Sequence, residues 1–274
     1  MKYALLAFQT PPALTEILEA ELSTLGYGAF WEDEGALHTA IAEPLFDEAA
    51  IQSLIEQYRP LGTITYTKKI EAKQNWNARW EASFQPIAVD GTCRVRAHFH
   101  APDTRFPLEI VITPKMSFGT GHHETTRLMM RQQLRLRNRF NTVLDLGTGT
   151  GILAILAKKL GAETVWGFDI EPWAVENATE NAKVNRVEIE TRLGTITEVE
   201  QLDISFDLVL ANINRSVLER EIPRYTALLN AGGTLLLSGF YERDIHRMLA
   251  HCHGLREEDR DREDRWACLR LVKK

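Results

Sequence analysis

The most informative stretch of the sequence is Val143-Leu144-Asp145-Leu146-Gly147-Thr148-Gly149-Thr150-Gly151-Ile152-Leu153. It begins as an apolar strand and ends in the first turn of a helix. Three glycines at alternate positions let the backbone turn tightly and approach a ligand at the helix N-terminus. A dinucleotide-binding loop reads G-x-G-x-x-G, and its last glycine would fall on Ile152. The stretch therefore predicts a ligand site but departs from the dinucleotide fingerprint.

Strands and helices alternate on both sides of this loop. Short apolar strands are predicted at 142–146, 164–169, 187–192, 206–212 and 234–240. Helical patterns lie between them at 152–160, 173–184, 215–229 and 241–252. Such alternation is typical of an α/β fold with a doubly wound, mostly parallel sheet and helices on both faces. A last strand over 265–272 follows a highly charged turn and is predicted to pair in an antiparallel hairpin.

Two polar residues stand at the ends of predicted strands. Asp169 lies 22 residues beyond Gly147, where a carboxylate can accept hydrogen bonds from ribose hydroxyls. The alternative is that Asp169 only caps the helix that begins at Glu171. Asn212 ends the fourth strand, at the edge where such sheets bind ligands, although an asparagine there is also a common turn residue.

The first part of the chain differs from the rest in charge and in pattern. Residues 1–60 hold ten acidic residues against two basic ones. The elements predicted over residues 2–70 follow the order β-α-β-β-α-β, which indicates a small ferredoxin-like α+β domain. This acidity disfavours direct nucleic-acid recognition and favours a basic protein partner, although a solvated acidic face is an equally good interpretation. The predicted organisation is a domain over 1–72, a helical linker over 73–86 and a larger domain over 87–274.

Composition excludes several classes of protein. The chain has 274 residues, of which 44% are hydrophobic and 26% charged, as in ordinary globular proteins. Its apolar runs are far shorter than the roughly 20 residues of a membrane span, and the apolar start is too short for a signal peptide. We therefore expect a cytoplasmic protein. The three cysteines show no C-x-x-C spacing, and His122-His123-Glu124 lacks a third ligand at useful spacing, so no metal is expected.

The G-x-G-x-G loop after an acidic strand end resembles the first motif of S-adenosylmethionine-dependent methyltransferases. Upstream lie a loop that enters a helix, Pro114-Lys115-Met116-Ser117-Phe118-Gly119-Thr120-Gly121-His122-His123-Glu124-Thr125-Thr126-Arg127-Leu128, and the aromatic series Trp76, Trp80 and Phe84. With Asn212-Ile213, this combination resembles the PrmA family, the methyltransferases of ribosomal protein L-eleven. His122, Glu124 and Asn214 depart from the family's usual residues.

The resemblance implies a fold, a cofactor and a substrate. It implies a ferredoxin-like substrate-recognition domain joined by a helical linker to a Rossmann-like class I methyltransferase domain. The cofactor is S-adenosylmethionine, and the acceptors are lysine side chains and the N-terminal α-amine of the ribosomal protein. Matching positions place cofactor contacts at Thr126, Gly147, Asp169 and Asn212, and the glycine loop adds Gly149 and Gly151.

Chemistry narrows the role of Asn212. An amine buried beside a sulfonium has a lowered pKa, so no dedicated base is required. Methyltransferases that act on planar nitrogens often carry proline and an aromatic residue after this strand, whereas Asn212-Ile213-Asn214-Arg215 has neither. We therefore expect Asn212 to position an sp³ amine or the cofactor. The alternatives are a methyltransferase of small molecules or nucleic acid, and a non-catalytic ribosome-binding protein that retains the cofactor pocket.

Two side-chain patterns have open interpretations. The series Trp76, Trp80 and Phe84 is interpreted as packing between domains rather than as a ligand platform. Arg127, Arg131 and Arg135 recur every four residues and form either a solvated helix face or, less favoured, a contact to ribosomal RNA.

Overall fold

The computed structural model describes residues 2–33, 35–72, 85–113, 119–136 and 139–274. The aromatic series Trp76, Trp80 and Phe84 and the first five residues of the upstream loop, 114–118, therefore lie outside the described residues. The chain divides into two compact units, Met1–Ser83 and Phe84–Lys274. None of the described helices is both long and apolar enough to cross a membrane.

The first unit is a four-stranded antiparallel sheet with two helices. Its elements are β1 (Lys2–Gln9), α1 (Pro12–Thr24), β2 (Gly28–Asp33), β3 (Ala36–Ala42), α2 (Glu48–Tyr58) and β4 (Thr65–Ala72), with short 3-10 turns at Glu43–Leu45 and Arg59–Leu61. The strands lie in the order β2-β3-β1-β4, and every pair is antiparallel. This is the topology of a ferredoxin-like sandwich.

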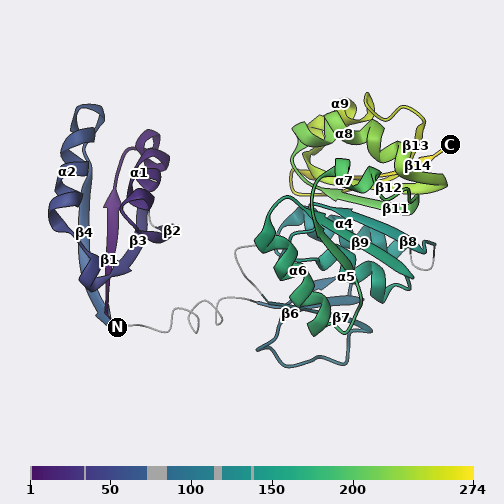
Figure 1. Cartoon of the computed structure of the whole chain (residues 1–274), viewed down its shortest axis with the longest axis horizontal. Helices are drawn as coiled ribbons and strands as arrows, with labels where there is room; N and C mark the ends of the chain where they lie inside the picture. The colour runs from purple at the N-terminus through teal and green to yellow at the C-terminus, as the bar shows by residue number, and fades with distance from the viewer. Residues whose placement is uncertain (1, 34, 73–84, 114–118, 137–138) are drawn as a thin grey trace. The chain divides into compact units, whose positions relative to one another are not determined.

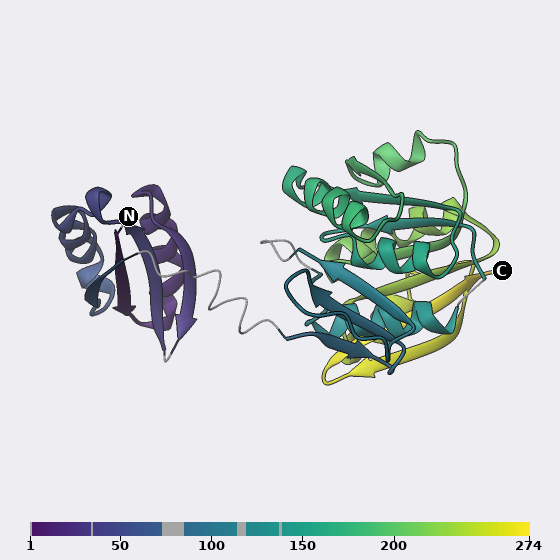
Figure 2. The same cartoon turned by 90° about the horizontal axis from the view of Figure 1, so that it is seen from below.

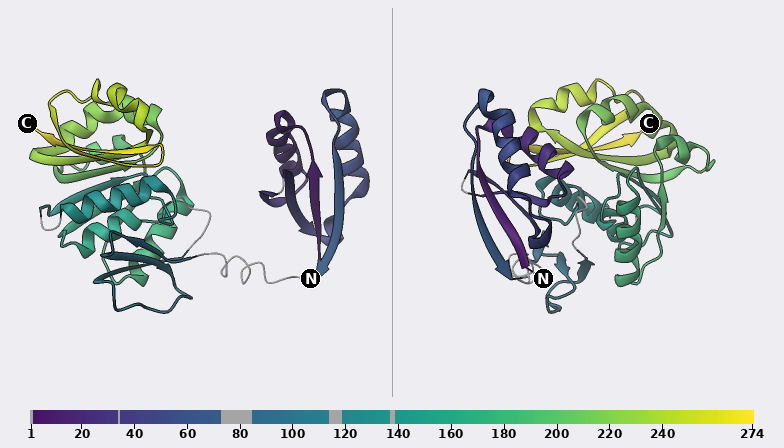
Figure 3. Two further views of the ribbon diagram at one scale, coloured as in Figure 1. Left: turned by 180° about the vertical axis from the view of Figure 1, so that it is seen from behind. Right: turned by 60° about the vertical axis from the view of Figure 1, so that its left-hand side comes forward.

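Apolar periodicity explains this unit. Three alternate residues of β1 are buried: Ala4, Leu6 and Phe8. They share one core with residues of α1 that are spaced four apart, on one face of that helix, and with residues of α2. Both helices therefore cover the same face of the sheet (Figure 3). Asp47 begins α2 because its Oδ1 accepts hydrogen bonds from the backbone N–H groups of Ala49 and Ala50 at 2.8 and 3.1 Å.

The second unit is built on a seven-stranded sheet (Figure 1). Its strands are β8 (Thr142–Leu146), β9 (Thr164–Asp169), β10 (Glu190–Leu193), β11 (Phe206–Asn212), β12 (Leu229–Tyr241), β13 (Leu255–Glu263) and β14 (Trp266–Lys273). They lie in the order β10-β9-β8-β11-β12-β14-β13. The first five are parallel, and β14 is antiparallel between β12 and β13. The prediction of a doubly wound, mostly parallel sheet is confirmed.

Helices cover both faces of this sheet, as Figure 2 shows from a second direction. Val143 joins the core beneath α4 (Glu124–Arg135) and α5 (Ile152–Lys159), whereas Leu144 joins the core on the other face. That second core includes residues of α7 (Ile196–Glu200), α8 (Arg215–Leu228) and α9 (Ile245–Leu249). The order of strands reverses between β8 and β11, and such a switch point leaves a crevice for a ligand at the carboxyl ends of the strands.

A smaller sheet of three strands, β5 (Ile87–Val89), β6 (Cys93–Ala97) and β7 (Leu108–Ile112), packs beside α5 and α6 (Pro172–Val184). Strands β6 and β7 are parallel. Asn181 Oδ1 accepts a hydrogen bond from Thr113 N, and its Nδ2 donates to Thr150 O, both at 2.8 Å. This buried amide therefore connects the end of β7 to the glycine loop.

The charged segment before the last strand corrects one prediction. Residues 255–263 form strand β13 rather than a turn, and it pairs with β14 as a hairpin. The reason is that its carboxylates have partners on α4. Arg131 binds Asp261 at 3.1 Å and Glu263 at 3.0 Å, and Arg135 binds Asp259 at 3.1 Å.

The same ion pairs revise the interpretation of the arginine face. Arg127, Arg131 and Arg135 face the carboxylates of β13, so this helix face is paired with the hairpin rather than freely solvated. Element ends also differ from the predictions. Strand β12 starts at Leu229 rather than 234, and the helix predicted over 241–252 is a 3-10 turn, Glu242–Asp244, followed by α9.

Candidate cofactor site

The glycine loop adopts backbone conformations that other residues rarely take. The φ angles of Gly147, Gly149 and Gly151 are 70°, 54° and 78°. A Cβ atom on Gly147 would lie 2.3 Å from Cγ2 of Ile213, which follows β11. A Cβ atom on Gly151 would lie 3.1 Å from that of Ala178 on α6. The first glycine therefore allows two strand ends to approach, and the third allows α5 and α6 to pack.

Hydrogen bonds fix the loop to β8 and β9. The backbone N–H groups of Gly147 and Thr148 donate to Phe168 O at 2.9 and 3.0 Å. The Thr148 hydroxyl donates to Asp145 Oδ2 at 2.7 Å. Complete burial raises the pKa of the Asp145 carboxyl to about 7, and the Thr148 hydrogen bond only partly offsets this rise. Asp145 is therefore a part of the loop's internal structure rather than a ligand-facing group.

Asp169 performs two structural tasks at the end of β9. Its Oδ2 accepts a hydrogen bond from Gly149 N at 2.9 Å, and its Oδ1 accepts one from Glu171 N at 3.1 Å. The second contact corresponds to the capping role that the sequence left open. An ionised carboxylate has about four acceptor positions, so each oxygen can still accept a hydrogen bond from a ligand.

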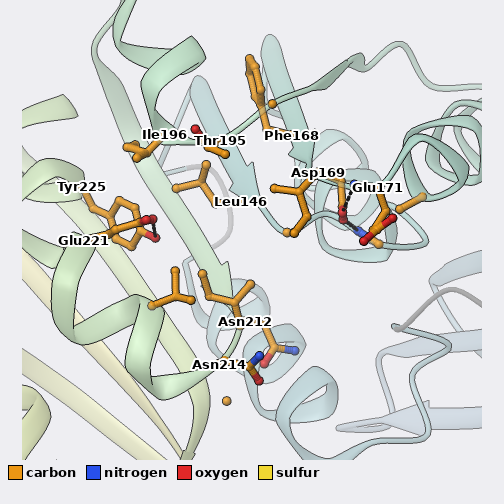
Figure 4. Close-up of a pocket in the computed structure, with 18 of the residues that line it drawn as sticks. Leu146, Phe168, Asp169, Glu171, Thr195, Ile196, Asn212, Asn214, Glu221 and Tyr225 are labelled. Atoms are coloured by element: carbon orange, nitrogen blue, oxygen red, sulfur yellow. Dashed lines mark hydrogen bonds between the residues drawn. The ribbon is translucent and has the colours of Figure 1, made fainter. Parts of the chain in front are cut away.

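One cavity of about 620 Å³ lies at the carboxyl edge of the large sheet. Figure 4 places Asp169 and Glu171 at one end of it and Glu221 and Tyr225 at the other. Asn212 lines the same cavity, and its buried Oδ1 accepts no hydrogen bond from any described group. The backbone after Asn212 packs tightly on Gly239, which lies in a bulge of β12: a Cβ atom on Gly239 would be 2.1 Å from Ile213 O. This close packing fixes the position of Asn212.

The structure brings four of the six predicted residues to this cavity: Gly147, Gly149, Asp169 and Asn212. The other two, Gly151 and Thr126, are buried but do not line it. Thr126 lies in the first turn of α4, and its buried hydroxyl has no partner among the described groups. Its neighbours Thr125 and His123 line the cavity instead, and His123 caps α4 by accepting a hydrogen bond from Thr125 N at 3.2 Å.

Sequence reasoning missed several lining residues. Glu221 lines the cavity from α8, and its Oε2 accepts a hydrogen bond from the buried Tyr225 hydroxyl at 2.7 Å. Trp266 lines it from the start of β14, and Trp173 from the start of α6. None of these belongs to a local motif. Only the strand order places Trp266 at the same edge as Asn212, so no sequence signal pointed to it.

The residues present fit an adenosyl group. Asp169 offers a carboxylate for ribose hydroxyls, and Ile170, Ile196 and Phe168 supply apolar surface for a base. The orphaned Asn212 oxygen requires a hydrogen-bond donor. In the large sheet the antiparallel strand β14 is inserted between β12 and β13. This fold and this site together define a class I methyltransferase that uses S-adenosylmethionine.

A family model described as ribosomal protein L11 methyltransferase (PrmA) matches residues 23–274, so the chain belongs to that family. A relative of that name from Porphyromonas gingivalis is 42% identical and aligns with 99% of this chain and 98% of its own length. Another from Phocaeicola vulgatus is 35% identical over the full length of both chains. A crystal structure of a ribosomal protein L11 methylase from Lactobacillus delbrueckii subsp. bulgaricus is 30% identical, with a TM-score of 0.63 over 70% of this chain and 100% of that one.

Proposed function

We propose that this chain transfers methyl groups from S-adenosylmethionine to amines of ribosomal protein L11, on lysine side chains and on the N-terminal α-amine. The observation that carries the proposal is the convergence of the glycine loop, Asp169 and Asn212 on one cavity at the sheet edge. Family membership supports the choice of substrate, because the relatives are named for it.

Each residue has a proposed role. Asp169 accepts the ribose hydroxyls, and Gly147 and Gly149 let the backbone approach the ligand. Gly151 acts indirectly, through the packing of α5 on α6. Thr126 remains a proposed contact because no described group accepts its hydrogen bond. S-adenosylmethionine, when bound, supplies an electrophilic methyl group on a positively charged sulfur.

The protein's part in the reaction is to position and deprotonate the amine. A lysine has a reference pKa of about 10.4, so roughly 0.1% of it is neutral near pH 7.4. To make half of it neutral, the site must lower the pKa by about 3 units, which costs about 4 kcal/mol. Apolar lining residues such as Leu146 and Ile213 exclude water and lower the pKa of an entering amine by desolvation. Asn212 Oδ1 then accepts a hydrogen bond from one of the two N–H groups of the neutral amine and so directs its lone pair. An α-amine, with a pKa of about 7.7 to 8.0, needs almost no shift.

We assign substrate selection to residues 1–72, with a linker over 73–86 and the methyltransferase domain over 87–274. Two facts support this division. The first unit has its own hydrophobic core, and the excess of acidic residues in its first 60 positions suits a basic ribosomal protein. The proposed place of action is the cytoplasm, and no direct recognition of nucleic acid is expected.

Calorimetry with S-adenosylmethionine, followed by transfer of labelled methyl to purified L11, tests this function. Intact-mass and fragment mass spectrometry then identify the modified amines. We expect both binding and transfer to lysine and to the N-terminus. Binding without any transfer would indicate a non-catalytic ribosome-binding protein, and transfer to RNA or to metabolites instead of L11 would contradict the proposed substrate.

A further inference from the structure

The order of strands places two different walls on the cavity. Asp169 ends β9 and Trp266 begins β14, and each strand is two positions away from β11, which ends at Asn212. Strands β9 and β14 lie on either side of β11, so Asp169 and Trp266 lie on opposite sides of Asn212. Neighbouring strands are about 4.8 Å apart, which separates the two side chains along the sheet edge. The Asp169 side holds the proposed cofactor contacts. The Trp266 side of the same cavity is lined by His123 from the start of α4.

We propose that Trp266, with His123 beside it, is the acceptor-side subsite of the cavity and binds an alkylammonium group through a cation–π contact. This inference rests on the proposed function. An amine must reach Asn212 from the side that the cofactor contacts do not occupy, and Trp266 stands on that side.

Ring contacts hold Trp266 in place. Its ring centre is 4.8 Å from that of His123, with planes at 66°, and 4.4 Å from that of Tyr241. Arg243 and Arg265 lie over the Tyr241 ring, at 5.1 and 5.2 Å from its centre. Tyr241 is thus engaged by the chain's own cations, whereas the rings of Trp266 and His123 line the cavity.

Arg127 joins the two elements that carry this wall. Its Nε donates to Glu263 Oε1 at 2.7 Å, and its guanidinium also donates to the backbone carbonyl of His122. Glu124 lies 3.5 Å away, so Arg127 sits between two carboxylates. The start of α4 and the β13–β14 hairpin are therefore clamped together, and the positive charge of Arg127 is balanced by Glu263 and Glu124.

The reaction explains why an aromatic wall is useful there. Methyl transfer forms a nitrogen–carbon bond while a sulfur–carbon bond breaks, so positive charge moves to the nitrogen. The product is an alkylated ammonium, and the face of a tryptophan ring attracts such a cation more strongly than the other aromatic residues do. A ring beside the nitrogen thus stabilises the charge that develops during transfer.

Choline and 3,3-dimethylbutan-1-ol provide a direct test, because they share one shape and differ by one positive charge. Each is added as an inhibitor of methyl transfer to L11 by the full-length protein, and each is also titrated directly into the protein loaded with S-adenosylhomocysteine, with the methyl NMR signals of the probe as readout. We expect choline to compete with L11 and to bind about 2- to 30-fold more tightly than the alcohol.

Three variants locate the preference for charge. Trp266→Phe should retain part of it, and Trp266→Leu should reduce the ratio of the two affinities to about one. Trp173→Leu is the matched control, because Trp173 lines the same cavity from α6, on the cofactor side. It should leave the choline preference unchanged. Calorimetry with S-adenosylmethionine checks that every variant retains its cofactor site.

The outcomes separate this inference from the proposed function. Equal affinity for choline and the alcohol in the wild-type protein, or an undiminished preference in Trp266→Leu, overturns the inference even if L11 is methylated. Loss of the preference in Trp173→Leu overturns it as well. Absence of transfer to L11, with a choline preference that depends on Trp266, refutes the proposed substrate and leaves the ammonium subsite standing.

Discussion

Asp169 Oδ2 accepts a hydrogen bond from the backbone N–H of Gly149 at 2.9 Å, which ties the end of β9 to the glycine loop. The same carboxylate is the proposed acceptor for ribose hydroxyls. Asp169→Asn should therefore weaken cofactor binding in two ways, through the contact to ribose and through the hydrogen bond that holds Gly149. Hydrogen bonds to charged groups contribute about 1.5–3 kcal/mol, so we expect the Kd for S-adenosylmethionine to rise by about 10- to 150-fold in calorimetry.

Glu171→Gln is the control for this variant. It removes a neighbouring negative charge that also lines the cavity but leaves the bond to Gly149 intact. Its Kd should change by less than about 3-fold, in line with the small value of exposed charges. An equal loss in both variants would show that net charge, not hydrogen bonding by Asp169, controls binding.

Asn212→Ala should lower turnover more than cofactor affinity. Removal of an amide oxygen that accepts from the amine costs about 1–3 kcal/mol in the transition state, which corresponds to about 5- to 150-fold in kcat. Asn214→Ala is the comparison, because Asn214 lines the same cavity and its side chain does not cap α8. Unchanged turnover in Asn212→Ala would remove this residue from the mechanism.

Gly147→Ala should destabilise the protein and abolish cofactor binding. The new methyl group would meet Ile213 at 2.3 Å, in addition to the cost of a φ of 70°. Gly232→Ala isolates the conformational cost of a positive φ, since Gly232 has a φ of 74° and nothing within 4 Å of its Cβ position. The control should lose about 1–2 kcal/mol in urea unfolding, and Gly147→Ala should lose clearly more. Equal losses would contradict the steric argument.

Asp145 should make the protein less stable as the pH rises. Burial raises its pKa from 3.8 to about 7, so the folded protein holds a proton that the unfolded chain releases. The cost grows between pH 4 and 7 and is complete above pH 7. Asp145→Asn removes this cost and keeps an acceptor for Thr148. Its free energy of unfolding, relative to wild type, should rise by up to about 4 kcal/mol from pH 4 to pH 8.

Asp207→Asn should show the opposite slope. Partial burial alone would raise the pKa of Asp207, but hydrogen bonds from the backbone N–H groups of Thr142 and Asn141 and from Asn230 outweigh it and lower the pKa. The stability that Asp207 contributes is therefore present above its unfolded pKa and lost on acidification. This variant should lose stability at pH 8 and less at pH 4. Parallel slopes for the two variants would contradict one of the two assignments, and the sign of the shared slope would show which.

Deletion of residues 1–72 should separate the two proposed activities. The larger unit keeps both of its core clusters, so it should still bind S-adenosylmethionine with a Kd within about 3-fold of the full chain. Methylation of L11 should fall below detection, because the proposed recognition domain is absent. Retained methylation of L11 at the full-length rate would refute the assignment of substrate selection to the first unit.

Local patterns sufficed for the parts of the structure that depend on neighbours in sequence. The glycine loop, the strand ends at Asp169 and Asn212 and the parallel order of the sheet all follow from short-range periodicity and from glycine's backbone freedom. Family membership confirms the resemblance that these motifs suggested.

Features that depend on tertiary pairing escaped the sequence reasoning. Strand β13 has the composition of a turn, and it forms a strand because arginines on α4, more than 120 residues away, neutralise its carboxylates. Trp266 reaches the cavity only because β14 inserts beside β12. Thr125, the neighbour of the proposed contact Thr126, lines the cavity, and no sequence motif singled it out.

Strand β13 also governs how the protein behaves toward its own copies. It is one of the two outer strands of the large sheet, and all eight residues from Arg256 to Glu263 are charged. Docking another strand against this edge would strip water from those charges, and the cost would exceed the gain from new backbone hydrogen bonds. The charged side chains of this edge, three of which also bind α4, therefore disfavour its pairing with a strand of another copy.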